Sequence, residues 1–173
     1  LSICAEAGIS LAGGHSIDAP EPIFGLAVNG LVDIAHIKQN NQARPGDILL
    51  LTKPLGVGIL TTAEKNGLIN EDMKSLAANQ MMQLNRVGEA LGKISGVHAM
   101  TDVTGFGLLG HLTEMCEGSG VSGRVYLDKV PLITPMLNAL IRQKAVPGGT
   151  NRNLKAYGHH IKVSDILDEH ITL

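Results

Sequence analysis

The chain has few aromatic residues and almost no excess charge. Among its 173 residues there are two Tyr, two Phe and no Trp, so aliphatic side chains and Met must build the core. The formal net charge is −2 at pH 7. This charge gives no electrostatic basis for binding nucleic acid or an acidic membrane surface. We therefore expect neither as a partner.

Cysteines and long apolar runs are equally sparse. Cys4 and Cys116 belong to no CxxC pair, so the sequence predicts two small buried thiols and no disulfide framework. This usage fits a reducing compartment and predicts a cytoplasmic protein. The longest apolar stretch, 48–63, is interrupted by Lys53 and Pro54 and is too short to cross a membrane. The first residue, Leu1, falls inside a helix-like pattern, which predicts that the chain is a fragment.

The apolar residues that are present predict helices alternating with short strands. A helix is expected from an N-cap at Asn70 to Gly96, because apolar residues recur there every three, four or seven positions. Further helices are expected at 105–116 and from Thr134-Pro135 through Ile141, and residues 1 to about 10 are expected to be the end of a helix closed by Gly8. Strands are expected at 23–32, 47–52 and 125–127, with a polar linker at 36–45. This order predicts an α/β (α+β) fold in which helices cover a mixed sheet.

Two glycine-containing turns carry the candidate chemistry. Asp102 ends an apolar stretch and precedes a glycine-rich helix start. A carboxylate there can bind a hard cation, and the free N–H groups of a helix start can face phosphate oxygens. Gly13-Gly14-His15-Ser16 is a second turn that lets backbone approach a polyphosphate. Either motif alone is more often a packing device than a ligand site.

Four separated motifs together resemble selenophosphate synthetases (selenide, water dikinases). They are Leu11–Gly30, Ala43–Leu60, Thr101–His111 and Val146–Asn153, in the family's order and over most of the chain. That family is part of the aminoimidazole ribonucleotide synthetase superfamily, whose members have two α/β domains and dimerise by closing their N-terminal sheets into a barrel. The resemblance implies that residues 1–35 are the tail of the N-terminal ATP-binding and dimerisation domain. It makes residues 36–173 a C-terminal synthetase-like domain that is truncated at its end.

The resemblance also implies a reaction and its site residues. The family converts ATP, selenide and water into selenophosphate, AMP and phosphate, and it acts as a homodimer. By this comparison Asp102 holds a Mg²⁺ that bridges the ATP phosphates, while Gly14, His15 and Ser16 contact ATP in the dimer partner's site. The family's reactive Cys or selenocysteine and its catalytic Lys fall before Leu1. No catalytic residue is therefore expected here, and the isolated chain is expected to be inactive and to bind Mg-ATP weakly.

Two other functions remain open at this point. One is a sister enzyme of the superfamily that uses ATP on a formylglycinamidine or a thiamine phosphate. The other is a catalytically silent paralogue that serves in dimerisation or regulation. The His15-Ser16-Ile17-Asp18-Ala19-Pro20 stretch favours selenophosphate synthetase over the sister enzymes, and the presence of Asp102 favours an active enzyme over a silent one.

Several polar residues are given structural interpretations. Asp18 and Glu21 are expected at a solvated rim, Lys53 at a solvated strand end, and His111 to pack or cap a helix. The pair His159-His160 is not expected to hold a metal, because adjacent residues do not share a helix face. For Gly148-Gly149-Thr150 and Asn153, an ordinary loop and a substrate contact are equally open.

Overall fold

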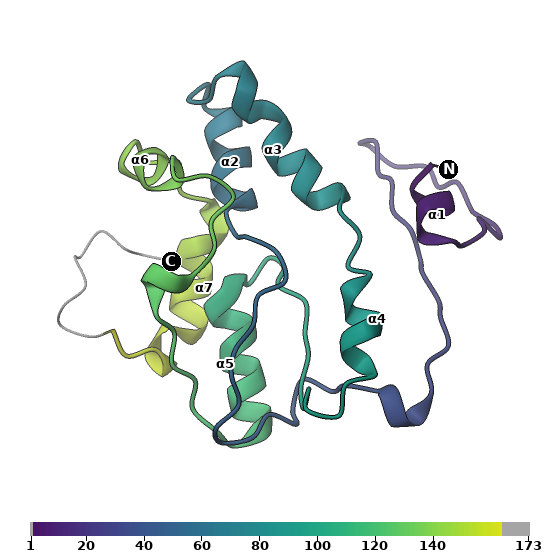
Figure 1. Ribbon diagram of the computed structural model, residues 1–173. Helices are drawn as coiled ribbons and strands as arrows, with labels where there is room; N and C mark the ends of the chain where they lie inside the picture. Colours follow the sequence, from purple (N-terminus) through teal and green to yellow (C-terminus); the bar gives the residue numbers. More distant parts are fainter. Residues whose placement is uncertain (1, 164–173) are drawn as a thin grey trace.

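The computed structural model describes residues 2–163, and these form helices joined by extended segments (Figure 1). In chain order the helical elements are α1 (Ser2–Ala7), η1 (Ile34–His36), α2 (Val57–Lys65), α3 (Glu71–Met82), α4 (Val87–Gly92), α5 (Gly107–Ser119), η2 (Leu127–Lys129), α6 (Leu137–Arg142), α7 (Gly148–Tyr157) and η3 (Gly158–His160). Within this range, no helix combines the length and apolar character that crossing a lipid bilayer requires.

The expected mixed sheet is wrong, because residues 2–163 contain no β-strand. The one β-type pairing among them is an isolated parallel bridge between Leu55 and Leu132. There the Leu55 N–H donates to the Pro131 carbonyl at 2.8 Å, and the Ile133 N–H donates to the Leu55 carbonyl at 2.9 Å. The segments expected as strands, 23–32, 47–52 and 125–127, form no ladder. An apolar pattern favours extended backbone, but a strand also needs the N–H and C=O groups of a neighbouring segment.

The buried core lies where α2 packs against α3 and α6 (Figure 1). It consists of aliphatic side chains only, as the scarcity of aromatic residues requires: Leu60, Ala63, Ala77, Leu137, Leu140 and Ala145. Helix α2 itself was not expected, because Pro54 and Gly56 interrupt the apolar stretch just before it. Its position between two helices, rather than its local sequence, makes this segment the centre of the core.

The helix expected from Asn70 to Gly96 is two helices, α3 and α4. Its start is confirmed, since the Asn70 side chain accepts a hydrogen bond from the Met73 N–H at 3.2 Å. The chain leaves the helix at Gln83, whose ψ is 120°. The Lys53 Nζ donates a hydrogen bond to the Gln83 carbonyl, which anchors Lys53 at this break between the helices. Lys53 is half-buried and is not a solvated strand end.

The two helices nearest the candidate site, α5 and α7, pack against each other. Helix α5 confirms the helix expected at 105–116 with shifted ends, and Gly120 terminates it with φ of 66°. Helix α7 begins at Gly148, so the segment Gly148-Gly149-Thr150 forms a helical turn and not an ordinary loop. The helix expected after Thr134-Pro135 starts at Leu137, and Thr134 Oγ1 accepts from the Met136 N–H at 3.3 Å.

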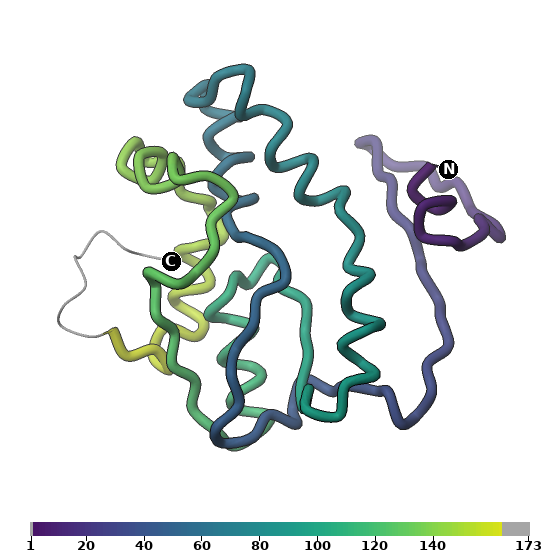
Figure 2. Tube along the Cα trace, viewed as in Figure 1, coloured from purple at the N-terminus to yellow at the C-terminus, as the bar shows by residue number. Residues whose placement is uncertain are grey.

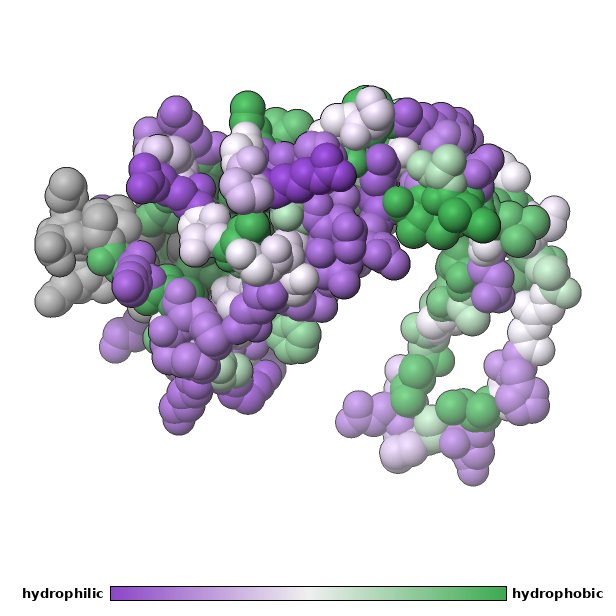
Figure 3. Space-filling model, turned by 90° about the horizontal axis from the view of Figure 1, so that it is seen from below, coloured by the Kyte–Doolittle hydropathy of each residue, from purple (hydrophilic) through white to green (hydrophobic). Residues whose placement is uncertain are grey.

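The N-terminal residues form an extended arm at one edge of the molecule. Gly8 ends α1 with φ of 72°, as expected. The chain then runs along the right edge and turns at η1 toward the remaining helices (Figure 2). Apolar side chains along this arm are exposed, among them Phe24 and Leu31. Figure 3 shows hydrophobic residues, in green, on the surface of the arm. The domain division at residue 35 stays a prediction.

Both cysteines are free thiols and both are half-buried. They are therefore less buried than the sequence suggested. Partial burial raises the pKa of the Cys116 thiol, against a smaller opposite effect of its hydrogen bond with the Gly123 backbone. A raised pKa keeps this thiol protonated and weakly nucleophilic at neutral pH.

Gly56 is the turn residue on which the core depends, and its replacement tests the packing of α2 on α6. Its φ is 131°, and a Cβ there would overlap the Leu137 side chain, with Cδ2 only 3.1 Å away. We expect Gly56→Ala to lower the free energy of unfolding by about 3 kcal/mol or more, from overpacking and backbone strain together. Urea unfolding followed by circular dichroism measures this loss.

Gly67→Ala is the matched control. Gly67 also has a positive φ, 68°, but a Cβ there meets nothing within 4 Å. Only backbone strain remains, so the expected loss is about 1–2 kcal/mol. Equal losses for the two variants would contradict the packing described for Gly56.

Candidate functional site

Asp102 lies in the extended segment that leads from α4 to the start of α5. Its side chain is exposed. Among the described residues, the hydrogen bond to Asp102 falls on its carbonyl oxygen, from Thr101 Oγ1 at 3.4 Å. The carboxylate is thus left available for a ligand. It stands five residues before Gly107, where α5 begins. The Gly107 N–H donates to the Thr104 carbonyl at 2.9 Å, and the next N–H groups of the first turn have no partner within the helix.

His111 holds the turn that follows Asp102. Only 8% of this residue is exposed. Its Nε2 lies 3.1 Å from the Thr104 backbone nitrogen and 3.0 Å from Thr104 Oγ1. A backbone N–H can only donate, so Nε2 is the acceptor and the proton of the neutral ring sits on Nδ1. The expectation that His111 packs is met, because its side chain is buried. It does not cap α5, because its partner Thr104 lies three residues before Gly107, the first residue of the helix.

Helix α7 holds the same turn from its other side. Asn153 Nδ2 donates to the Gly105 carbonyl at 2.8 Å, and the Tyr157 hydroxyl donates to the Phe106 carbonyl. Partial burial raises the pKa of Tyr157, against a smaller opposite effect of its hydrogen bond with Asn153, so the hydroxyl keeps its proton for this bond. Asn153 therefore has a structural partner inside the chain. The sequence left this role open.

Gly110 makes the approach of α7 possible. It is buried in α5, and a Cβ there would lie 2.9 Å from two atoms of the Tyr157 ring and 2.8 Å from the Phe106 Cβ. The missing side chain lets the ring of Tyr157 reach over α5 to the turn. The glycine spacing of this motif thus serves helix packing, while the carboxylate beside it remains exposed.

An ion pair anchors the segment that carries Asp102 at its other end. His98 Nδ1 lies 2.8 Å from Asp47 Oδ1, and Asp47 Oδ2 accepts the Arg44 N–H at 2.8 Å. The Arg44 N–H bond, followed by the His98 bond, lowers the pKa of the Asp47 carboxyl. Since His98 is four residues before Asp102, this pair fixes where the extended segment starts.

The expected polar linker, 36–45, is held against the rest of the chain. Asn40 Nδ2 donates to Glu114 Oε1 at 3.0 Å, and the Ala43 N–H donates to Ser119 Oγ at 3.0 Å. Both partners lie on α5. The turn that contains Asp47 is therefore positioned by the same helix that carries His111.

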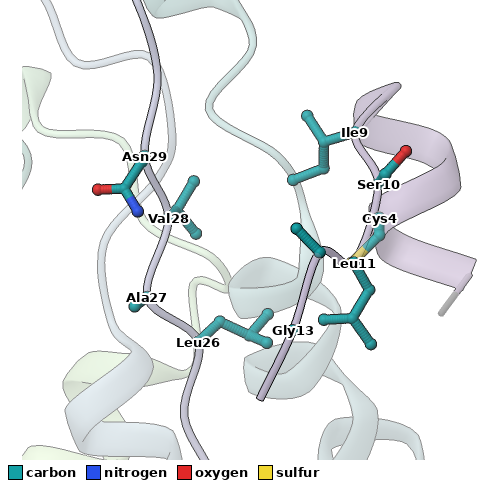
Figure 4. Close-up of a pocket in the computed structure, with 10 residues that line it drawn as sticks. Cys4, Ile9, Ser10, Leu11, Gly13, Leu26, Ala27, Val28 and Asn29 are labelled. Atoms are coloured by element: carbon teal, nitrogen blue, oxygen red, sulfur yellow. The ribbon is translucent and has the colours of Figure 1, made fainter.

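Gly14, His15 and Ser16 lie on the N-terminal arm and are exposed, as are Asp18 and Glu21. The arm runs along one edge of the molecule, away from α5, so the structure does not bring these residues to Asp102 (Figure 1). A cavity of about 330 Å³ lies beside them, between Cys4, the stretch 9–13 and the stretch 26–29 (Figure 4). Its lining carries no charged side chain, so it does not suit a polyphosphate.

Potential metal ligands are dispersed. The described part of the chain holds no cluster of three or more His, Cys, Asp or Glu side chains suited to a metal ion. The rings of His159 and His160 lie 3.9 Å apart, and His160 Nε2 lies 3.1 Å from Glu117 Oε1. Asp102 therefore supplies one carboxylate, and a Mg²⁺ there would take its other ligands from phosphate oxygens and water.

Comparison with known proteins identifies a family for this sequence. Residues 44–144 match the family described as "AIR synthase related protein, C-terminal domain". The chain is 57% identical over 163 residues to a protein of Aeromonas hydrophila subsp. hydrophila named "Selenide, water dikinase", covering 94% of this chain and 47% of that protein. A protein of the same name from Colwellia psychrerythraea is 58% identical over 160 residues, covering 92% of this chain and 46% of the relative.

The chain belongs to the AIR synthase related family, and its resemblance to selenide, water dikinases is confirmed. It spans about half the length of the curated relatives that it matches. The match at 44–144 includes Asp47, His98, Asp102 and His111, and it ends before α7.

Sequence reasoning named His111 and Asn153 but connected neither of them to the turn beside Asp102. A signal for His111 was present, because a histidine between Leu108, Leu112 and Met115 lies on the apolar face of a helix and there needs a polar partner. No local signal identified Tyr157 or the Asp47–His98 pair. Their partners are 51 residues away in each case.

The Asp47–His98 pair gives a pKa prediction. In the folded protein the pKa of Asp47 should lie below its ordinary value of 3.8. The pair then contributes stability at pH values above the unfolded pKa, and that contribution is lost as pH falls through the folded pKa. Removing the imidazole in His98→Ala should raise the Asp47 pKa only part of the way, because the Arg44 N–H bond remains. Carboxyl-carbon NMR titration measures both values.

His159→Ala is the control. It removes an exposed imidazole that lies against the His160 ring and makes no hydrogen bond with Asp47 in the described part of the chain, so it should leave the Asp47 pKa unchanged. An unperturbed Asp47 in the unsubstituted protein, or identical titrations with and without His98, would show that the pair does not form in solution.

Proposed function

We propose, from the chain's membership of the AIR synthase related family, that the whole protein makes selenophosphate from selenide, ATP and water and releases AMP and phosphate. The name shared by the matched relatives, selenide, water dikinase, supports this reaction. The observation in the structure that carries it is the exposed Asp102 carboxylate, which no described residue engages, on the turn that leads into α5. The isolated chain, with one such carboxylate, is proposed to be inactive.

Asp102 is proposed to hold a Mg²⁺ ion that bridges the phosphates of ATP. An exposed, uncommitted carboxylate fits the all-oxygen coordination that Mg²⁺ prefers. When bound, the ion supplies neutralising charge for the phosphoryl groups. The residues of this chain have the task of positioning: Asp102 binds, and the free N–H groups at the start of α5 donate to phosphate oxygens.

Gly14, His15 and Ser16 are proposed to complete the nucleotide site of a second copy in a homodimer. They are exposed and lie away from Asp102 within one chain. His15 and Ser16 each carry a side-chain donor for a phosphate oxygen. A cytoplasmic location is proposed as well, because the two cysteines are free thiols and fit a reducing compartment.

The superfamily's other activities are weaker candidates. A sister enzyme would use ATP on a different acceptor, whereas the matched relatives described above share a name that specifies selenide. A silent paralogue would have no use for an exposed carboxylate at this turn. Asp102 therefore favours an active enzyme.

Asp102→Ala in the full-length protein is the test. We expect selenophosphate and AMP from Mg-ATP and selenide in the unsubstituted protein, observed by phosphorus NMR. The variant should lose at least about 100-fold in rate, because residues that only orient metal ligands already cost about 10- to 100-fold.

Asp128→Asn is the control, since Asp128 is an exposed acid on η2 outside the site. It should keep the rate of the unsubstituted protein. ADP as the nucleotide product would point to a sister kinase. Full activity of Asp102→Ala would remove Asp102 from the site.

A further inference from the structure

We propose that His111, Asn153 and Tyr157 are positioning residues that aim the Asp102 carboxylate and the start of α5 at a common point. They do not touch a ligand in this proposal. They act through the backbone of residues 104–106, which joins the carboxylate to the helix. The inference rests on the proposed function for the identity of what Asp102 binds.

Three consecutive residues of this turn are each held by a side chain from a helix. His111 accepts from Thr104, Asn153 donates to Gly105 and Tyr157 donates to Phe106. The turn already has its own backbone closure, in which the Gly107 N–H donates to the Thr104 carbonyl at 2.9 Å. The side-chain bonds therefore add rigidity to a turn that is already closed.

A histidine at position 111 lowers the stability of the folded protein in a way that an aliphatic residue would not. Its Nδ1 is buried without a hydrogen-bond partner and lies 3.8 Å from Glu114 Oε2. A buried polar atom without a partner is destabilising, and an aliphatic side chain would fill the same face of α5 without it. The acceptor that Nε2 presents to Thr104 accounts for a histidine at this place.

The α7 contacts likewise depend on a specific approach. Asn153 and Tyr157 are four residues apart and lie on one face of α7. Gly110 gives that face access, because a Cβ there would lie 2.9 Å from the Tyr157 ring. Helix α7 thus packs on α5 at the place from which the Asn153 and Tyr157 side chains reach successive carbonyl groups of the turn.

Rigidity at this turn matters because the Asp102 carboxylate accepts no hydrogen bond from the described part of the chain. Its direction relative to the α5 N–H groups is set by the few residues between them. If those residues become mobile, the carboxylate and the α5 N–H groups are still present but no longer point at the same place. Affinity for a metal–phosphate group then falls. The fold loses little, since the apolar core lies at α2, α3 and α6.

Mn²⁺ binding to the full-length protein tests this proposal. Mn²⁺ accepts the carboxylate and phosphate oxygens that suit Mg²⁺, and electron paramagnetic resonance reports its free concentration. Titrations are run with adenylyl imidodiphosphate, a poorly hydrolysed ATP analogue. We expect His111→Leu and Asn153→Asp each to raise the Mn²⁺ dissociation constant about 10-fold. His111→Gln retains an acceptor and should stay within about threefold of the unsubstituted protein.

Asn151→Asp is the matched control for charge on the same helix, because Asn151 is an exposed α7 residue. It should leave Mn²⁺ affinity unchanged. Thermal unfolding of every variant separates positioning from folding. If Asp102→Ala weakens Mn²⁺ binding while His111→Leu and Asn153→Asp do not, the positioning proposal is overturned and the proposed function stands.

Two other outcomes also overturn the proposal. Weaker binding that tracks a lower unfolding temperature, with no recovery in His111→Gln, would mean a purely structural role. Unchanged Mn²⁺ affinity in Asp102→Ala would remove the metal role of Asp102, and with it the reason for holding the turn.

Discussion

The close packing of α7 on α5 over Gly110 is the contact on which the candidate site depends. Without a side chain at Gly110, the ring of Tyr157 lies against α5 and its hydroxyl reaches the Phe106 carbonyl. The same seating brings Asn153 to the Gly105 carbonyl. A turn of three residues is thereby held from two helices, and the exposed carboxylate of Asp102 sits at its open end.

The apolar core and the candidate site lie on different helices of the protein. The fully apolar core lies between α2, α3 and α6, and the turn beside Asp102 is held instead by polar side chains bonded to backbone. Apolar residues of the extended segments stay at the surface, with Phe24 at 89% and Ile48 at 84% exposure. Stability and site geometry therefore respond to different substitutions.

The proposed nucleotide site has two parts that lie far apart in one chain. Asp102 stands at the start of α5, and residues 14–16 stand on the extended arm (Figure 1). In the proposed homodimer, the arm of one copy would reach the turn of another, so that one ATP molecule would contact both parts. The separation of the two parts within one chain is compatible with that proposal.

The sequence by itself determined the features that depend on neighbouring residues. These include the Asn70 cap, the end of α1 at Gly8 and the helix after Asp102, because caps and helical periodicity act within one or two turns. The four motifs also identified the family. Only the tertiary structure decided that the extended segments form no ladder, and that Asn153 and His98 support the Asp102 segment. Those bonds join residues 48 and 51 positions apart, and no local pattern specifies which distant groups will meet.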